Sequence, residues 1–217
     1  TKNNFLDVVS HGIDVVTLGN HYLAKKEITT FIDDYDNLLR PLNLNKAHPG
    51  KGSNVFECLG KKIRVTNLIG RVFMNEGADN PFDALENVVA TDEADIHIVD
   101  FHAEATGEKE SLAWAFDGKI SALIGTHTHV QTNDARLLKN KTFYLSDVGM
   151  NGPYNGILGA SKESVIKRTW TGLPSVFGVE DDDTYLLNGV ILTFNDFNQI
   201  TDYQLLNLTF AAKEINQ

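Results

Sequence analysis

The chain has 217 residues and a net charge of −10, and 42% of its residues are hydrophobic and 22% charged. This balance is typical of a globular protein with one core of ordinary size, and no apolar run is long enough to cross a membrane. The acidic balance disfavours long nucleic acids, which need a basic track. It does not exclude a small phosphorylated ligand, because bound metal ions can reverse the local field.

The single cysteine, Cys58, cannot form an internal disulfide, and no charged-then-apolar leader opens the sequence. Both features favour the cytoplasm, with a removed signal peptide as the alternative. Cys58 lies in a strand-like stretch, so we expect it to be a small buried apolar residue. The sequence contains no repeat, low-complexity segment or linker, which predicts a single domain over residues 1–217.

The first third of the chain predicts two helices, a buried strand and a hairpin. Apolar residues at helical spacing predict a helix over 1–11, which Gly12 ends. The β-branched run 14–18 predicts a buried strand that leads into Gly19-Asn20-His21. A second helix is expected over 24–34, followed by a hairpin of strands 53–58 and 62–69.

The rest of the chain alternates helices with strands and then returns to a hairpin. Asn80 and Pro81 are N-terminal signals for a helix that continues to about residue 89. The later elements are expected as strands over 95–100, 119–124, 142–146, 189–194 and 200–208, and as helices over 108–116 and 161–168. This order predicts α/β layers with partly antiparallel sheets.

Three of the predicted strands each deliver polar residues immediately after their carboxyl ends. One delivers Asn20 and His21, the next His102, and the third His127 and His129. Ligands collect at that edge of an α/β sheet, and imidazole with amide oxygen suits zinc, iron or manganese better than calcium or magnesium. If the backbone is extended, His127 and His129 point to the same side. The alternative is that these residues are only polar caps.

Other polar residues have structural explanations of equal or greater weight. His11 lies where a cationic side chain complements helix carbonyls, and His97 lies inside a strand, where packing is expected. Asp100 and Glu104 flank His102, so either could orient its ring or simply be solvated in a loop. Asp147 begins a glycine-rich loop that could approach a phosphate or only form turns.

Four motifs together resemble one family. They are Gly19-Asn20-His21, Asp100-Phe-His-Ala-Glu104, Gly125-Thr-His-Thr-His-Val-Gln-Thr132 and Asp147-Val-Gly-Met-Asn-Gly-Pro153. In this order they are similar to the YmdB-like bacterial phosphodiesterases of the calcineurin-like metallophosphoesterase superfamily. The similarity runs over nearly the whole chain.

The resemblance implies a four-layer α/β/β/α sandwich holding two metal ions, iron or manganese, with zinc as an alternative. Asn20, His102 and His127 would bind the second metal, and His129 the first. His21 would be the general acid, and metal-assisted in-line attack of water would hydrolyse 2′,3′- and 3′,5′-cyclic monophosphates. The implied partner is a small phosphorylated substrate, with no substrate-binding residue identified, no membrane, and self-association left open.

One departure from the family pattern is important. Family members begin with a strand ending in Gly-Asp and a second ending in Gly-Glu-Asn, whose carboxylates bind the metals, and neither motif stands in the corresponding place here. We therefore expect a fold that lacks its first strands and a chain that binds at most one metal weakly. A regulatory or ligand-binding protein with little turnover is accordingly the alternative to an enzyme.

Overall fold

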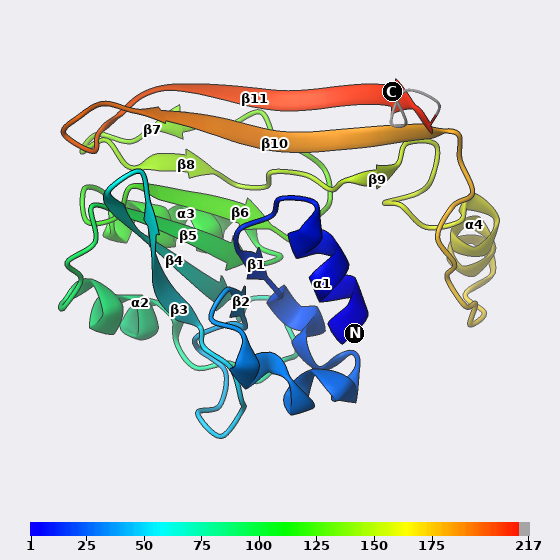
Figure 1. Ribbon diagram of the computed structural model, residues 1–217. Helices are drawn as coiled ribbons and strands as arrows, with labels where there is room; N and C mark the ends of the chain where they lie inside the picture. The colour runs from blue at the N-terminus through cyan, green and yellow to red at the C-terminus, as the bar shows by residue number, and fades with distance from the viewer. Residues whose placement is uncertain (213–217) are drawn as a thin grey trace.

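The computed structural model describes residues 1–212 and shows a mixed α/β protein built on two main sheets (Figure 1). The larger sheet has six strands in the order β3-β4-β5-β6-β8-β7. They are β3 (Ser53–Cys58), β4 (Lys61–Ile69), β5 (Ile96–His102), β6 (Ala122–Thr126), β7 (Arg136–Leu137) and β8 (Phe143–Leu145). Strands β4, β5, β6 and β8 run parallel, whereas β3 and β7 pair antiparallel at the two edges.

A long hairpin forms most of the second sheet. Strands β10 (Thr184–Phe194) and β11 (Ile200–Ala211) pair antiparallel, and the short β9 (Gly152–Pro153) adds to β10. A separate pair is formed by β1 (Val16–Thr17) and β2 (Leu38–Leu39), which run parallel. The closing hairpin predicted from the sequence is confirmed, and both of its strands extend beyond the expected ranges.

Four α-helices accompany these sheets: α1 (Lys2–Ser10), α2 (Pro81–Val89), α3 (Thr106–Ala115) and α4 (Lys162–Thr171). The Asn80 side chain accepts a hydrogen bond from the backbone nitrogen of Phe82 at 3.0 Å, as expected of an N-cap. His11 follows α1, and its Nδ1 lies 2.8 Å from the Asp7 carbonyl oxygen. The predicted capping roles of Asn80 and His11 are therefore confirmed.

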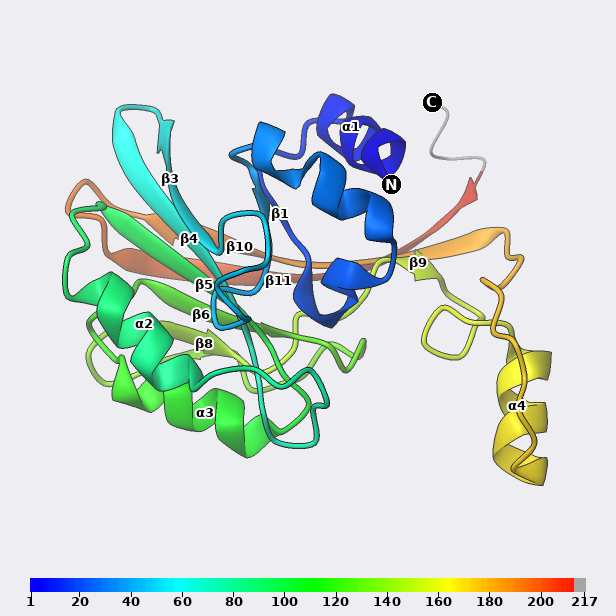
Figure 2. The ribbon, with the colours of Figure 1, turned by 90° about the horizontal axis from the view of Figure 1, so that it is seen from below.

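The core of residues 1–212 has three clusters: one around Phe5 and Ile32, and two on the two faces of the larger sheet. On one face, Leu85 of α2 and Leu112 of α3 pack with Val99 and Leu123 of the sheet. On the other face, Phe143 belongs to a cluster that includes side chains of β10 and β11. Figures 1 and 2 show the resulting order of helices, sheet and second sheet. The α/β class is confirmed. The four-layer α/β/β/α arrangement is not confirmed, because within residues 1–212 no helix covers the upper face of the β10–β11 hairpin in Figure 1.

The expected helix over 24–34 is wrong, because this segment forms two short 3₁₀ helices. These are η2 (Lys26–Thr30) and η3 (Ile32–Asp34), and they follow η1 (Gly19–Leu23). The hydroxyls of Thr29 and Thr30 donate to backbone carbonyls three residues earlier, at 2.9 and 2.7 Å. Such bonds compete with a regular helix, while the buried Ile28, Phe31 and Ile32 still repeat at helical spacing.

The prediction for Cys58 is also wrong, because this side chain is exposed. Cys58 ends the edge strand β3 next to the turn at Leu59 and Gly60, where the last residues of the strand face solvent. The sequence could not predict this exposure, because the end of an edge strand and the end of a buried strand can have the same residue types.

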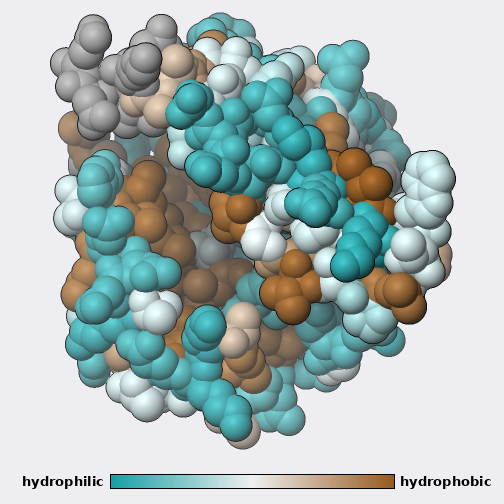
Figure 3. Space-filling model, turned by 90° about the vertical axis from the view of Figure 1, so that its right-hand side faces the viewer, coloured by the Kyte–Doolittle hydropathy of each residue, from teal (hydrophilic) through white to brown (hydrophobic). Residues whose placement is uncertain are grey.

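Helix α4 stands away from both sheets. None of its residues is buried, and Trp170 is 87% exposed. Figures 1 and 2 show it projecting from one side of the molecule, and the space-filling view of that side shows apolar residues lining a hollow (Figure 3). Among the helices of residues 1–212, none is long and apolar enough to cross a membrane.

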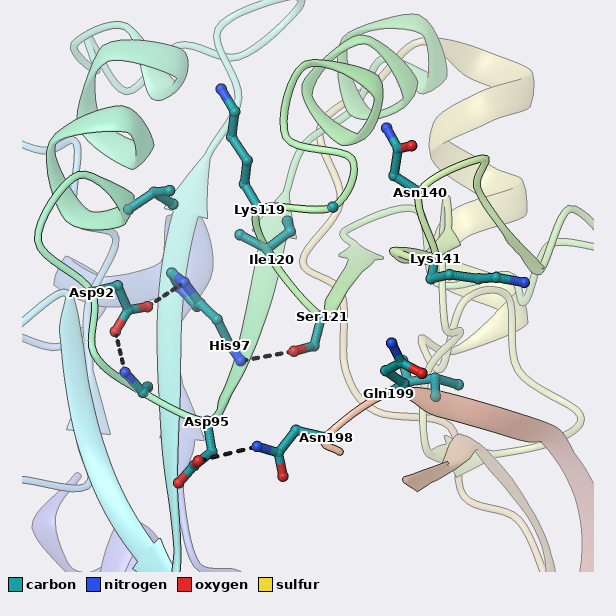
Figure 4. A pocket seen from close by; sticks show the side chains of 14 residues that line it. Asp92, Asp95, His97, Lys119, Ile120, Ser121, Asn140, Lys141, Asn198 and Gln199 are labelled. Carbon is teal, nitrogen blue, oxygen red and sulfur yellow. Dashed lines mark hydrogen bonds and ion pairs between the residues drawn. The ribbon is translucent and has the colours of Figure 1, made fainter. Parts of the chain in front are cut away.

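His97 lies in a buried polar network at the amino end of β5, beside a cavity of about 330 Å³ (Figure 4). The ring is 4% exposed, its Nδ1 lies 2.8 Å from an Asp92 carboxylate oxygen, and its Nε2 lies 2.9 Å from the Thr66 hydroxyl. Arg64 also binds Asp92, at 2.8 Å. Burial lowers the pKa of His97 from 6.5 to about 4, against the opposing effect of Asp92. The structural role expected for His97 is confirmed.

This burial predicts a pH dependence of stability. Because the folded state disfavours the protonated ring, the unfolded state binds more protons between pH 6.5 and about 4. Stability therefore falls as the pH falls through that window, by at most about 1.4 kcal/mol per pH unit. Urea unfolding at pH 7, 6 and 5 should show a shallower loss for His97→Gln than for the wild type. His11→Gln, which alters an exposed ring, should keep the wild-type slope.

Candidate functional site

The site candidates follow the carboxyl ends of the parallel strands, as the sequence predicted. Strand register places Ile69 of β4 opposite His102 of β5, and His102 opposite Thr126 of β6. Asp147 follows the end of β8 at the same edge. The register of adjacent strands therefore brings residues from distant parts of the sequence into one row at this edge of the sheet.

The loop after β1 is held against this row by a close backbone approach. The Gly19 nitrogen donates to Asn67 Oδ1 at 3.3 Å, and Asn67 Nδ2 donates to Asp100 Oδ2 at 3.1 Å. Gly19 has a φ of +59°, and a Cβ there would lie 2.6 Å from His102 Nδ1. Only glycine fits this position, and it places Asn20 next to His102.

Hydrogen bonding fixes the tautomer of His102. The Thr126 hydroxyl donates its single proton to Asp100 Oδ1 at 2.8 Å. Its oxygen must then accept from His102 Nδ1, which lies 2.9 Å away. The proton of the neutral ring is thereby on Nδ1, and Nε2 presents a lone pair toward the loops.

Two further atoms approach that lone pair. Asn20 Oδ1 lies 2.9 Å from His102 Nε2, and His127 Nδ1 lies 3.0 Å from it. His127 Nε2 lies 3.2 Å from a Glu104 carboxylate oxygen, which favours the proton on that nitrogen. Turning the Asn20 amide would remove one of these contacts but not the contact between the two rings. The structure thus brings Asn20 Oδ1 and His127 Nδ1 to the same nitrogen of His102.

His129 does not join this group. His127 has a φ of +111° and His129 a φ of +70°, so the segment is not extended and the condition for a shared side fails. The exposed His129 ring instead places Nδ1 3.3 Å from the Leu158 carbonyl oxygen. That His129 lies alongside this group and faces a neighbouring metal position stays a prediction.

The remaining candidates, His21, Asp100 and Glu104, make different contacts. His21, in η1, is exposed, and its charge contributes to the lowered pKa of His102, so it lies near the site. Asp100 acts on His102 through Thr126, as expected of an orienting carboxylate. Glu104 contacts His127 rather than His102. Both flanking carboxylates are therefore engaged with the site.

Burial controls the charges beneath this edge. It lowers the pKa of His102 to about 4, helped by the nearby His127 and Lys109, so the ring is neutral at neutral pH. Burial also raises the pKa of Asp100, against hydrogen bonds from Thr17 and Thr126. At neutral pH the His102 imidazole is thus an uncharged group that lies close to a buried carboxyl group.

Lys109, which was not expected from the sequence, forms a buried ion pair below the site. Its Nζ lies 3.3 Å from Asp147 Oδ2, and both side chains are 2% exposed. Asp147 Oδ2 also accepts from the Thr128 nitrogen at 2.8 Å, and Oδ1 from the Gly149 nitrogen at 2.9 Å. Asp147 thereby holds the residue between the two histidines, and Lys109 neutralises its charge.

Comparisons with known proteins identify relatives of this chain. The model of the YmdB-like protein family matches residues 1–204. The chain belongs to the YmdB-like family. A relative from Bacillus subtilis (strain 168), named 2′,3′-cyclic-nucleotide 2′-phosphodiesterase, is 45% identical over 198 residues, which cover 90% of this chain and 74% of that protein.

Two solved structures have the same fold as this YmdB-like chain. A hypothetical protein from Thermus thermophilus has a TM-score of 0.90 at 35% identity, covering 96% of this chain and 81% of the other. A structure described as a novel phosphatase from Mycoplasma pneumoniae has a TM-score of 0.89 at 33% identity, covering 100% of this chain and 80% of that one.

The described residues fit one half of the two-metal centre that the family resemblance implies. An amide oxygen and a second imidazole nitrogen both approach His102 Nε2, and lone pairs that face one another repel unless a cation lies among them. Within residues 1–212, no group of three or more His, Cys, Asp or Glu side chains is arranged to hold a metal ion. The donor set therefore fits one ion at Asn20, His102 and His127, and it does not complete a second.

Because Asp147 binds the Thr128 nitrogen, we expect a substitution of Asp147 to loosen the backbone between His127 and His129. Asp147→Asn should remove the charged acceptor for the Thr128 nitrogen, a bond to a charged group worth about 1.5–3 kcal/mol. Amide hydrogen exchange at Thr128 should then accelerate by about 10- to 100-fold. Exchange followed by NMR or mass spectrometry measures this directly.

A second, partly buried ion pair offers the matched control. Arg64 and Asp92 form an ion pair at the opposite end of the sheet, with side chains 20% and 10% exposed. Asp92→Asn should destabilise the protein without changing exchange at Thr128 beyond the global effect. Equal acceleration at Thr128 in both variants would show that Asp147 has no specific hold on this segment.

Proposed function

We propose that this chain is a phosphodiesterase that hydrolyses 2′,3′-cyclic nucleotides, and also 3′,5′-cyclic monophosphates, at the edge formed by Asn20, His102 and His127. The observation that carries the proposal is the contact of two acceptor atoms with His102 Nε2, at 2.9 and 3.0 Å. That contact calls for a cation, and cations at such an edge suit phosphoryl chemistry. The relatives named as phosphodiesterase and phosphatase support the same class of reaction.

The proposed centre uses two metal ions, iron or manganese, with zinc as the alternative. When bound, they would neutralise the phosphoryl oxygens and lower the pKa of the attacking water. Asn20, His102 and His127 would hold one ion, and His129 would belong to the other. Asp100 and Thr126 keep the Nε2 lone pair of His102 aimed at the site, while Glu104 does the same for Nδ1 of His127.

His21 is the proposed general acid. It follows Asn20 directly in η1, is exposed, and is close enough to influence the charge state of His102. In this role its imidazolium gives a proton to the ribose oxygen that leaves phosphorus. The proton neutralises the alkoxide as the bond breaks, which is the step that a poor leaving group cannot complete alone.

Replacing His21 should separate binding from chemistry. In the metal-loaded protein, His21→Ala should leave metal content unchanged and reduce kcat for 2′,3′-cyclic nucleotides by about 10²–10⁴-fold. The loss should be smaller for bis-p-nitrophenyl phosphate, whose leaving group needs little protonation. Steady-state kinetics on both substrates with metal analysis of the same samples measures this.

The control for this variant is His11→Ala, because His11 is an exposed histidine that caps α1. It should keep wild-type kinetics on both substrates. An equal loss for good and poor leaving groups in His21→Ala would instead assign His21 to positioning the phosphate.

A second candidate is a regulatory protein that binds a cyclic nucleotide with little turnover. It is favoured by one observation: residues 1–212 contain no group of three or more His, Cys, Asp or Glu side chains that could hold a metal ion. Saturable binding of 2′,3′-cyclic AMP without product release by the metal-loaded protein would select this candidate. Under either candidate the proposed ligand is a small phosphorylated molecule, and a cytoplasmic location stays a prediction.

A further inference from the structure

A pocket of about 260 Å³ lies beside His129, between the site loops and the second sheet. The residues that matter for its chemistry are His129, Met150, Tyr154, Leu158, Asn188 and Asn207. Its volume is below the range of about 300–1,000 Å³ that holds a drug-sized ligand, so it suits one small ring system. Its lining combines an aromatic ring and apolar side chains with amides.

We propose that this pocket binds the nucleobase of a cyclic nucleotide whose phosphate lies at Asn20, His102 and His127. The inference rests on the proposed function and concerns the base of the substrate, which the phosphate site does not recognise. A flat heteroaromatic ring offers apolar faces and polar edges. Stacking on an aromatic side chain and hydrogen bonding to amides are the interactions that recognise it.

Tyr154 supplies an aromatic ring for stacking, on a backbone that is held by hydrogen bonds. Its side chain is 53% exposed, and its backbone nitrogen donates to the Thr184 carbonyl oxygen at 2.9 Å. The next residue, Asn155, donates from its backbone and side-chain nitrogens to Asp182, at 2.7 and 3.0 Å. Because the backbone is held on both sides of the ring, little order is lost when a base stacks on it.

The amides of the pocket are oriented in advance. Asn188 Nδ2 donates to the Met150 carbonyl oxygen at 2.7 Å, and Asn207 Nδ2 donates to Asn188 Oδ1 at 2.7 Å. Asn207 Oδ1 has no hydrogen-bond partner among the residues that the structure describes. It is therefore an acceptor suited to an exocyclic amino group, as adenine, cytosine and guanine carry.

The pocket is connected to the phosphate edge through His129. Its Nδ1 lies 3.3 Å from the Leu158 carbonyl oxygen, and its carbonyl oxygen accepts from the Met150 nitrogen at 3.0 Å. Met150 and Leu158 both line the pocket. A ligand filling it therefore lies next to the segment that carries His127. The cavity in Figure 4 lies at the amino ends of β5 and β6, away from this edge, and is lined by charged residues.

The test compares a substrate that has a base with one that lacks it. In the metal-loaded protein, Tyr154→Ala should raise KM for 2′,3′-cyclic AMP by about 5- to 150-fold, the usual effect of one stacked base. KM for the 2′,3′-cyclic phosphate of 1-O-methylribose should not change, and kcat should stay within about twofold for both. Tyr154→Phe should behave as the wild type, and so should Phe197→Ala, which removes an aromatic ring that is 83% exposed at the β10–β11 turn.

An equal rise of KM for both substrates, or no rise for the nucleotide, overturns the base pocket. Calorimetric binding of AMP separates this inference from the proposed function. If neither substrate is hydrolysed, weaker AMP binding by Tyr154→Ala than by the wild type upholds the pocket while the proposed hydrolysis fails. Unchanged AMP binding overturns the pocket whatever the turnover.

Discussion

The single proton of the Thr126 hydroxyl determines how the whole edge is arranged. It goes to Asp100, so the oxygen accepts from His102 Nδ1 and the ring turns its other nitrogen toward the loops. This requires His102 and Thr126 to stand opposite each other, which the parallel register of β5 and β6 provides. A one-residue slip would turn His102 to the other face of the sheet. The position of the candidate ligands is therefore a consequence of strand pairing.

Elements with a strong local pattern could be predicted from the sequence. The helix after Asn80 and the strands that lead into His102 and His127 lie within a few residues of their expected ranges, because capping and apolar runs act locally. The segment 24–34 differs, since its apolar spacing fits both an α-helix and successive 3₁₀ turns. Threonine hydroxyls decide between them, and their preference does not show in the spacing.

The two residues that the sequence did not single out as a pair owe their role to tertiary contacts. Lys109 stands between Glu108 and Glu110 in α3, a pattern typical of a solvated helix face. Its stem packs near Gly125, where a Cβ would lie 1.8 Å from the Ser146 carbonyl oxygen and 3.0 Å from Lys109 Cδ. Asp147 then balances its charge. Neither the packing near Gly125 nor the pairing with Asp147 can be derived from helical periodicity.

Backbone strain explains how one short segment can serve two places. His127 and His129 have φ values of +111° and +70°, which cost about 1–3 kcal/mol each for residues other than glycine. An extended backbone would avoid this cost, but it would turn both rings to the same side. The strained backbone instead sends His127 toward His102 and His129 toward Leu158. Asp147 holds Thr128, the residue between them, so the buried carboxylate opposes relaxation to the extended form. Strain and ion pair thus act on one segment of three residues, in which His127 belongs to the proposed phosphate edge and His129 to the pocket beside it.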